Sequence, residues 1–275
     1  MTQRKGVPPD VVVRDARPLE DYFVATCSHT GESDEIDASG RRRAAWMEAM
    51  QEHGLRAKVA TIDGRPVGFV YTMPIEICPW GPVGRDLTVL PCLWVLPDQM
   101  KRGAGRALVA AAEEEARRQG SKGIVTTAYE QYDWFMPAAF FGSRGFVEAR
   151  RRGGTAIVWR PFDDTAEPPQ FLEPNYRYEP VPGKVVVDLF WHTFCQTVDV
   201  EAARVREVAA EFGDRVALNE YCADDRDTLL RYQIPRAIYV NGTEIGWGYE
   251  APRDGIREAI TKAIASVGAA GTDRS

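Results

Sequence analysis

A proline-rich stretch divides this chain of 275 residues into two unequal parts. Residues 163–183 read DDTAEPPQFLEPNYRYEPVPG, with five prolines and no regular spacing of apolar residues. Proline fixes its own backbone angle and lacks the N–H that helices and sheets need, so the stretch is predicted to be an extended connection. We expect a domain over residues 1–163, a linker over 164–182, a second domain over 183–265 and a flexible tail over 266–275.

The composition is that of a globular protein with packed cores. Hydrophobic residues make up 44% of the chain and charged residues 27%, so enough apolar surface exists to offset the loss of chain entropy. We see neither a long apolar run nor a signal-peptide pattern, so we expect no membrane partner and a cytoplasmic location. A net charge of −6 disfavours a broad phosphate-binding face, so nucleic acid is not an expected partner. The oligomeric state stays open.

The cysteines and histidines are too few and too scattered for a metal centre or a disulfide framework. The chain has five cysteines and three histidines, no CxxC pair, and therefore an odd cysteine count. Zinc sites need closely spaced ligands, and small disulfide-bonded folds need paired cysteines. We expect no metal and a reducing compartment.

Strand and helix patterns predict an α/β fold for both parts. In the first part, Asp63-Gly64 between two alternating apolar runs predicts a hairpin. Helices are expected over residues 40–52 and over 104–119, where apolar residues follow the amphipathic spacing. In the second part, the predicted order is strand, helix, strand, helix, strand, strand, helix, with the last helix over 253–265.

Residues 93–108 read LWVLPDQMKRGAGRAL and predict a strand, a glycine loop and a helix in direct succession. Such a loop aims free backbone N–H groups and the positive end of the helix dipole at an anion. Lys101, Arg102 and Arg106 add positive charge, and the small residues let a pyrophosphate approach the backbone.

Two common phosphate motifs do not fit this segment. A dinucleotide site requires GxGxxG after the first strand, whereas this loop follows the fourth strand and lacks the third glycine. A kinase-type loop requires GxxxxGK followed by serine or threonine, which is absent. The alternative interpretation is a helix that starts on a glycine turn and binds nothing.

Residues 9–161 resemble the Gcn5-related N-acetyltransferase (GNAT) family. The family's acetyl-CoA signature, [RQ]xxGx[GA], corresponds to MKRGAG at residues 100–105, between the fourth strand and the next helix. A second family feature, an aromatic helix ending in Gly-Phe, corresponds to residues 138–146. The resemblance implies an α+β fold with a central mixed sheet, and transfer of an acetyl group from acetyl-CoA to an amine.

The resemblance also implies which residues hold the coenzyme. The loop amides would bind the pyrophosphate, and the fourth strand would bond the pantetheine arm and polarise the thioester carbonyl. The coenzyme-binding residues expected on this basis are Leu93, Trp94, Val95, Met100, Lys101, Arg102, Gly103, Ala104, Gly105 and Arg106.

The family's usual acid and base are missing from their positions. Met100 replaces the first arginine or glutamine of the signature, Phe141 stands where a tyrosine acid is common, and Val89 lies near the position of a glutamate base. We expect Glu130 and Tyr132, just past the fifth strand, to act as catalytic substitutes near the pocket mouth. The alternative is that both are surface-loop residues.

Residues 185–198 read VVVDLFWHTFCQTV, a predicted strand that ends in an aromatic-flanked cysteine and leads into a helix, and residues 233–235 read QIP before a predicted hairpin. With these features, residues 184–265 resemble a thioredoxin-like fold, and the fusion of the two parts resembles YoaP-like bacterial proteins. Cys195, the third catalytic candidate, takes the position of the first active cysteine, but Val198 occupies the resolving position, so the domain is monothiol. A helix N-terminus favours a Cys195 thiolate, with help from His192; a buried structural cysteine is the alternative. The resemblance implies a cis peptide bond before Pro235.

We therefore expect an acyl-CoA-dependent N-acetyltransferase that acts on the amine of a small molecule. Acetyl-CoA would be the co-substrate, and the second domain would help to form the acceptor site. Two alternatives stay open. One is a thiol-binding or redox-sensing protein with a degenerate acetyltransferase domain, and the other is an acyltransferase whose donor is bound to a carrier or a tRNA.

Overall fold

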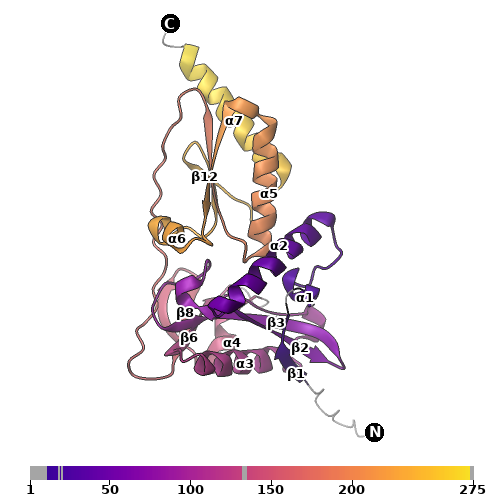
Figure 1. The fold of residues 1–275 in the computed structure, drawn as a ribbon. Coiled ribbons are helices and arrows are strands. Elements are labelled where there is room, and N and C mark those ends of the chain that lie inside the picture. The colour runs from indigo at the N-terminus through magenta and orange to yellow at the C-terminus, as the bar shows by residue number, and fades with distance from the viewer. Residues whose placement is uncertain (1–10, 18, 20, 132–134, 273–275) are drawn as a thin grey trace.

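The computed structural model describes residues 11–17, 19, 21–131 and 135–272. It contains two sheets, each with its own helices (Figure 1). The first part consists of strands β1 (Val11–Asp15), β2 (Arg56–Ile62), β3 (Arg65–Pro74), β4 (Leu87–Val89), β5 (Leu93–Val95), β6 (Gly123–Tyr129), β7 (Val147–Arg152) and β8 (Thr155–Pro161), and of helices α1 (Tyr22–Ala25), α2 (Asp34–Met50), α3 (Ala104–Arg118) and α4 (Ala138–Gly142).

The first sheet is mixed, as expected. Its strands follow the order β1-β2-β3-β4-β6-β8-β7, with β5 paired to β3. Neighbours are antiparallel except for β4 and β6, which are parallel. Asp63 (φ 51°) and Gly64 (φ 74°) form the turn between β2 and β3. Two central residues with positive φ match the twist of the flanking strands, and the predicted hairpin is confirmed.

Helix α2 begins earlier than the expected start at residue 40. The Ser33 side chain caps it by accepting a hydrogen bond from the Ile36 N–H at 3.2 Å. Three acidic residues in the first turn suit the positive end of the helix dipole. Capping therefore extends the helix into a polar stretch in which apolar spacing gives no signal.

The apolar run over residues 87–96, predicted to be a strand broken by Pro91, forms two strands, β4 and β5, on either side of this proline. Before it, β4 pairs with β6, and the Leu90 N–H donates to the Val125 carbonyl at 2.8 Å. Proline has no N–H to continue this ladder, and the chain then pairs with β3 alone as β5. Among the described strands, none pairs with the other edge of β5, so the sheet opens between β5 and β6.

Helices α2 and α3 lie on opposite faces of this sheet (Figure 1). Leu108 and Val109 of α3 pack into a core that includes Ile124. Met47 of α2 packs into the other core with Tyr71. Each face of the sheet is therefore buried by its own helix, and the opening between β5 and β6 connects the two faces.

The second sheet has the strand order β10-β9-β11-β12. Its elements come in the predicted order: β9 (Val185–Trp191), α5 (Gln196–Glu211), β10 (Val216–Cys222), α6 (Arg226–Tyr232), β11 (Ala237–Val240), β12 (Thr243–Ile245) and α7 (Arg253–Thr272). Helix α7 continues through residues 266–272, where a flexible tail was expected. None of the described peptide bonds is cis, so the cis bond implied at Pro235 is absent.

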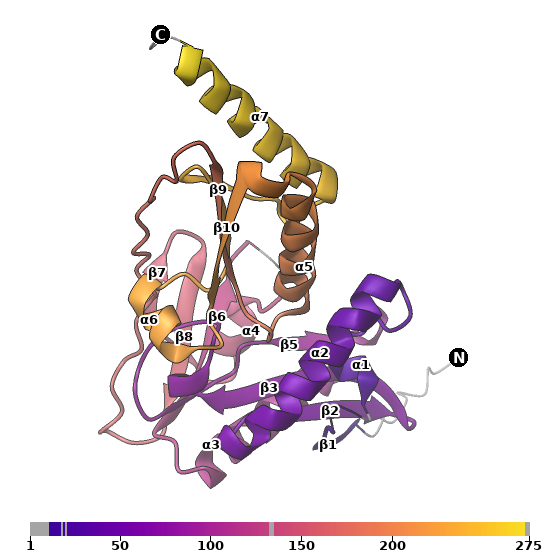
Figure 2. The ribbon, with the colours of Figure 1, turned by 45° about the horizontal axis from the view of Figure 1, so that its top comes forward.

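Helices α2 and α5 bring the two parts into contact (Figure 2). Arg42 donates to both carboxylate oxygens of Asp199, with the shortest distance 2.6 Å, and the Asp199 side chain is 2% exposed. Glu35 accepts from Arg204 at 2.7 Å. Phe194 of the second part is buried in the core under α2. Ion pairs and apolar packing thus hold the parts together.

The linker runs along both parts. Gln170 and Val83 exchange two backbone hydrogen bonds of 2.8 and 2.9 Å, which tie the linker to the first part. The Tyr176 hydroxyl donates to the Asp188 carboxylate on β9 at 2.7 Å, which ties it to the second. Aromatic and polar side chains therefore hold this proline-rich segment in place.

We predict that Arg42→Ala destabilises the protein, because it leaves the buried Asp199 carboxylate without its cation. Losing one partner of such a pair costs on the order of 2–4 kcal/mol. Urea unfolding should show a lower midpoint. Arg41→Ala is the control, since Arg41 is exposed on the same helix. Equal midpoints for the two variants would contradict the prediction.

Candidate active site

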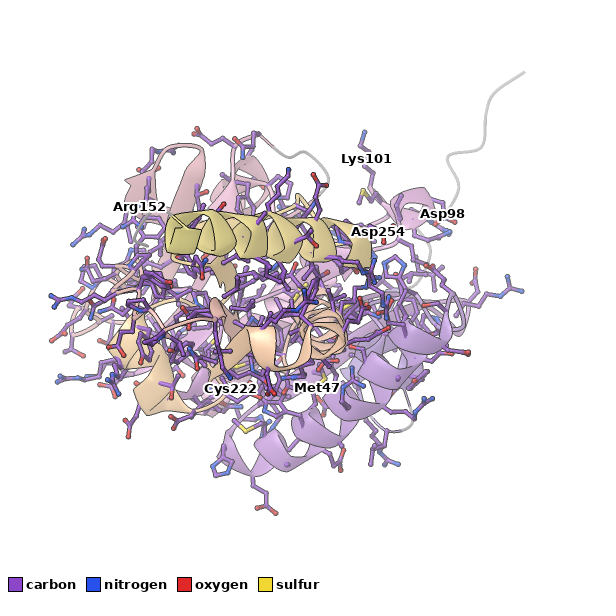
Figure 3. The ribbon with its side chains drawn as sticks, turned by 90° about the horizontal axis from the view of Figure 1, so that it is seen from above. Met47, Asp98, Lys101, Arg152, Cys222 and Asp254 are labelled. Atoms are coloured by element: carbon purple, nitrogen blue, oxygen red, sulfur yellow. The ribbon has the colours of Figure 1, made fainter. Side chains whose placement is uncertain are left out.

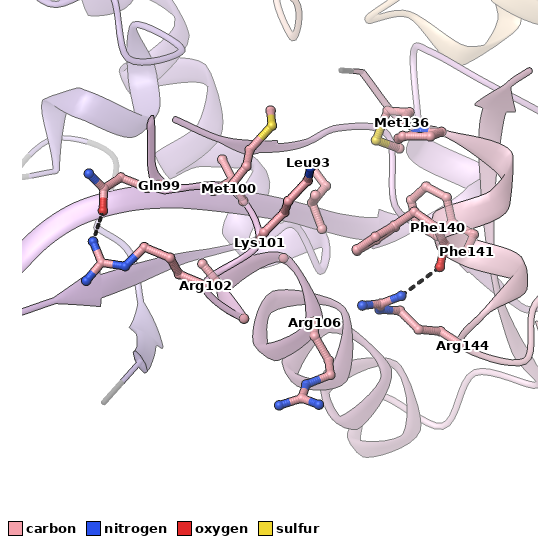
Figure 4. A pocket seen from close by; sticks show the side chains of 15 residues that line it. Leu93, Gln99, Met100, Lys101, Arg102, Arg106, Met136, Phe140, Phe141 and Arg144 are labelled. Atoms are coloured by element: carbon pink, nitrogen blue, oxygen red, sulfur yellow. Dashed lines mark hydrogen bonds between the residues drawn. The ribbon is translucent and has the colours of Figure 1, made fainter. Parts of the chain in front are cut away.

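A groove of about 770 Å³ opens beside the first turn of α3 (Figure 4). It is lined by Leu93, Val95, Gln99, Met100, Lys101, Arg102, Gly103, Ala104, Gly105, Arg106, Met136, Pro137, Phe140, Phe141 and Arg144. Nine of the ten expected coenzyme-binding residues are in this set. The exception is Trp94, whose side chain packs on the α2 face of the sheet.

The glycine loop leaves backbone donors free. Gly103 caps α3 with φ 98°, a backbone conformation that glycine adopts readily, and a Cβ there would meet no atom within 4 Å. The first helical hydrogen bond runs from the Ala107 N–H to the Gly103 carbonyl at 3.0 Å. The N–H groups of Ala104, Gly105 and Arg106 therefore have no partner within the helix and can bind an anion.

Two arginines add charge to the groove with no carboxylate partner among the residues that the structure describes. Arg106 lies on α3, and Arg144 follows α4 (Figure 4). Arg144 donates to the Phe140 carbonyl at 2.8 Å and lies over its ring, while its Nε has no partner. Partial burial and the charge of Arg106 lower the pKa of Arg144. Two unbalanced cations in one groove favour a phosphate-bearing ligand.

The other two cations of the loop contribute differently. Lys101 projects from the edge of the molecule (Figure 3). The Arg102 guanidinium is held by a hydrogen bond to Gln99 (Figure 4). Exposed charges of this kind attract an anion over distance more than they fix its position.

Aromatic residues of α4 form the wall of the groove opposite the loop. Phe140 and Phe141 belong to it, and Met136 and Pro137 extend it. A Cβ on Gly105 would lie 3.3 Å from the Phe140 ring, so glycine permits this close packing. The coenzyme-binding residues predicted from the sequence do not include this wall, although the Gly-Phe feature marks the helix that forms it.

The exposed edge of β5 presents backbone groups to the opening of the sheet. On the β3 side, the Cys92 carbonyl accepts from the Tyr71 N–H at 3.1 Å. Backbone groups of successive strand residues point in opposite directions, so those of Leu93 and Val95 face away from β3. A chain with amide groups can therefore pair with this edge as an added strand does.

The expected acid and base groups are not at the groove. Phe141 and Val89 are buried apolar residues. Glu130 forms an ion pair with Arg151 of β7 and is not among the residues that line the groove, so its catalytic role stays a prediction. Tyr132 lies outside the described residues. The lining residues include no carboxylate, histidine or tyrosine.

Cys195 precedes α5 as expected, but its surroundings do not favour a thiolate. Burial raises the pKa of the Cys195 thiol and outweighs the nearby positive charges of Arg43 and Arg236. Its backbone N–H donates to His192 Nδ1 at 3.3 Å. Burial, with the same two arginines, lowers the pKa of His192 to about 3, so the imidazole is neutral. The expectation of an activated Cys195 is corrected, because burial dominates over the helix dipole.

All five cysteines are free. In the part of the chain that the structure describes, no three histidine, cysteine, aspartate or glutamate side chains come close enough to hold a metal ion. Nor does any helix in that part have the length and apolar character needed to cross a bilayer.

We predict that iodoacetamide alkylates native Cys195 slowly at pH 7.5. A raised pKa leaves little thiolate at that pH, and the thiolate is the nucleophile. The rate, followed by mass spectrometry of the Cys195 peptide, should be at least about tenfold below that of glutathione. Urea-unfolded protein provides the reference rate for the accessible thiol. A rate that levels off below pH 8 would overturn this assignment.

Residues 19–146 match the model of the Acetyltransferase (GNAT) family. No curated protein sequence matches the chain. Among solved structures, it is similar to PaiA N-acetyltransferase of Thermoplasma acidophilum in complex with coenzyme A, at 16% identity over 56% of this chain and 99% of that chain (TM-score 0.40). It is also similar to YncA of Salmonella typhimurium with its cofactor acetyl-CoA, at 21% identity over 57% and 97% (TM-score 0.42). A third is the ribosomal-protein-alanine N-acetyltransferase of Brucella melitensis, at 19% identity over 55% and 99% (TM-score 0.40). The family match identifies residues 19–146 as a GNAT acetyltransferase domain.

Proposed function

We propose that this protein transfers an acetyl group from acetyl-CoA to the amine of a small molecule. The observation that carries the proposal is the groove beside α3. Along it follow backbone N–H groups with no partner within α3, two arginines that pair with no described carboxylate, and the edge of β5 that no described strand covers. Acetyl-CoA carries phosphates, an amide-containing arm and a thioester in the matching order, so each part meets a group that can bind it.

Bound in this way, the thioester would lie at the break in the sheet. The pyrophosphate would occupy the loop at Gly103, and the pantetheine arm would pair with Leu93 and Val95. The acetyl group would then be near Pro91, where β4 and β5 separate. An amine could approach it there from the α2 face, opposite the coenzyme.

The reaction requires the neutral amine nitrogen to attack the thioester carbonyl, forming a C–N bond as the C–S bond breaks. The amine loses a proton, and the coenzyme leaves as a thiol once a proton reaches its sulfur. No carboxylate, histidine or tyrosine lines the described groove. We therefore attribute the rate to positioning of the reactants and to backbone donors at the carbonyl oxygen.

We further propose that the second domain is thioredoxin-like and forms part of the acceptor site. Parallel β9 and β10, with β11 antiparallel to β9, support the fold assignment. Phe194 supports the acceptor role, because its ring packs on Tyr71 under α2, with 5.2 Å between ring centroids. A cytoplasmic location would keep the five free cysteines reduced.

We predict that Gly103→Glu abolishes acetyl-CoA binding in calorimetry and acetylation of pooled primary amines in mass spectrometry. The new carboxylate would fill the open space beside the loop and repel the pyrophosphate. Gly120→Glu is the matched control, since Gly120 also has positive φ and open space but follows the far end of α3. Unchanged affinity in Gly103→Glu would refute the coenzyme assignment.

We predict that Arg144→Gln weakens acetyl-CoA binding about tenfold, or ~1.4 kcal/mol, through the loss of a charge-assisted contact to phosphate. The salt dependence of binding should also become shallower, because one charge fewer faces the ligand. Arg65→Gln, at an exposed position at the start of β3, controls for net charge. If both variants bind equally well, Arg144 does not contact the coenzyme.

A further inference from the structure

A guanidinium group lies buried where the two parts of the chain meet. Arg43 of α2 is 1% exposed. Its Nε donates to the Phe194 carbonyl at 2.7 Å, and its Nη1 donates to the Ala25 carbonyl and, at 3.3 Å, to Cys27 Sγ. No carboxylate pairs with Arg43 among the residues described. A buried charge without a counter-ion is strongly unfavourable, so this position favours an anion.

Three of the neighbouring acidic groups do not balance this charge. Cys92 and Cys195 lie close to Arg43, but burial raises the pKa of both thiols. Burial also raises the pKa of Tyr71, whose hydroxyl donates to the Val24 carbonyl at 2.6 Å. These three groups keep their protons at neutral pH, and the guanidinium keeps its positive charge.

Two buried donors of the second part lack acceptors in the same region. His192 and Gln196 are 0% and 6% exposed, and the Nε2 atom of each has no hydrogen-bond partner. Because His192 Nδ1 accepts the Cys195 N–H, the ring hydrogen is on Nε2. Unsatisfied buried donors cost stability unless a ligand accepts their hydrogen bonds. Both side chains flank Cys195 at the start of α5, where the first N–H groups have no partner within the helix.

These groups lie on the side of the sheet from which the acceptor would approach. Cys92 directly follows the break at Pro91, and its side chain packs in the core under α2 together with Phe194 and Cys195. The coenzyme groove is on the α3 face. A ligand of the Arg43 cluster is therefore the acceptor and not the coenzyme.

We infer that Arg43, His192 and Gln196 bind a carboxylate of the acceptor, so that the substrate is an amino acid or another amine that carries a carboxylate. One guanidinium balances one carboxylate, whereas a phosphate group carries nearly two charges at neutral pH. A planar carboxylate also matches the planar donor set of arginine. This inference rests on the proposed function.

The test uses the full-length chain with pairs of compounds, each an α-amino acid and the amine that lacks its carboxylate. In at least one of these pairs, thermal-shift titration should show that the α-amino acid binds at least about tenfold more tightly than its matching amine. Its kcat/KM for acetylation should exceed that of the matching amine at least a hundredfold. Equal or better binding of the amines, or no binding of any amino acid at tens of millimolar, would overturn the inference.

Gln196→Leu separates ligand binding from a structural role. Replacing an unpaired buried donor with an apolar group should keep or raise the melting temperature. The KM for the carboxylated amine should rise at least about tenfold, with acetyl-CoA affinity unchanged. His192→Phe repeats the test at a second donor, and Gln51→Leu, at the C-terminal end of α2, is the control.

Three outcomes decide between the explanations. A wild-type KM in both Gln196→Leu and His192→Phe would overturn the inference. The inference would also be overturned if the Cys27→Ser variant bound the carboxylated amine and the wild-type chain did not. Cys27 would then be the counter-ion of Arg43 in the wild-type chain. Absence of acetyl-CoA binding by the wild-type chain would instead overturn the proposed function.

Discussion

The separation of two strands at Pro91 is the constraint on which the site depends. Before it the chain hydrogen-bonds to β6, and after it the chain hydrogen-bonds to β3. Because proline cannot donate, the ladder ends there, and no described strand pairs with the second edge of β5. The glycine loop follows directly, so one short segment supplies both the strand edge and the anion-binding amides. The two faces of the sheet are then available for different ligands.

The second part covers the face opposite the coenzyme groove. Phe194 is buried among residues of the first part, and burial of an aromatic side chain contributes roughly 1.5–3 kcal/mol. Arg43 reaches the Phe194 carbonyl from α2, and Arg42 beside it pairs with Asp199 of α5. The same helix thus holds the second part in place and brings a positive charge to the junction. Docking and the chemistry of the acceptor side are therefore linked through α2.

The described lining of the groove offers binding groups but no carboxylate, histidine or tyrosine. Phe141 cannot donate a proton, and Glu130 is paired with Arg151 away from the lining. An enzyme of this kind depends on how its reactants are oriented, and on the acceptor reaching the thioester as a neutral amine. Cys195, which a helix start would otherwise activate, is kept protonated by burial. Thiol chemistry is therefore not favoured at the junction of the two parts.

The sequence alone determined the features that depend on neighbours in the chain. The Asp63-Gly64 turn, the glycine loop before α3, the order of elements after the linker and the break at Pro91 all follow from local backbone chemistry. The surroundings of Trp94, Glu130 and Cys195 were decided by tertiary structure. Sheet pairing turns Trp94 to the α2 face, β7 supplies the partner of Glu130, and packing against the core under α2 leaves Cys195 only partly exposed. Arg43 is a further case, since it is 1% exposed between Ala25 and Cys27 of the first part and Phe194 of the second. Burial and ion pairing depend on residues that are far apart in the sequence. For these side chains, they decide exposure and protonation more strongly than the neighbouring residues in the sequence do.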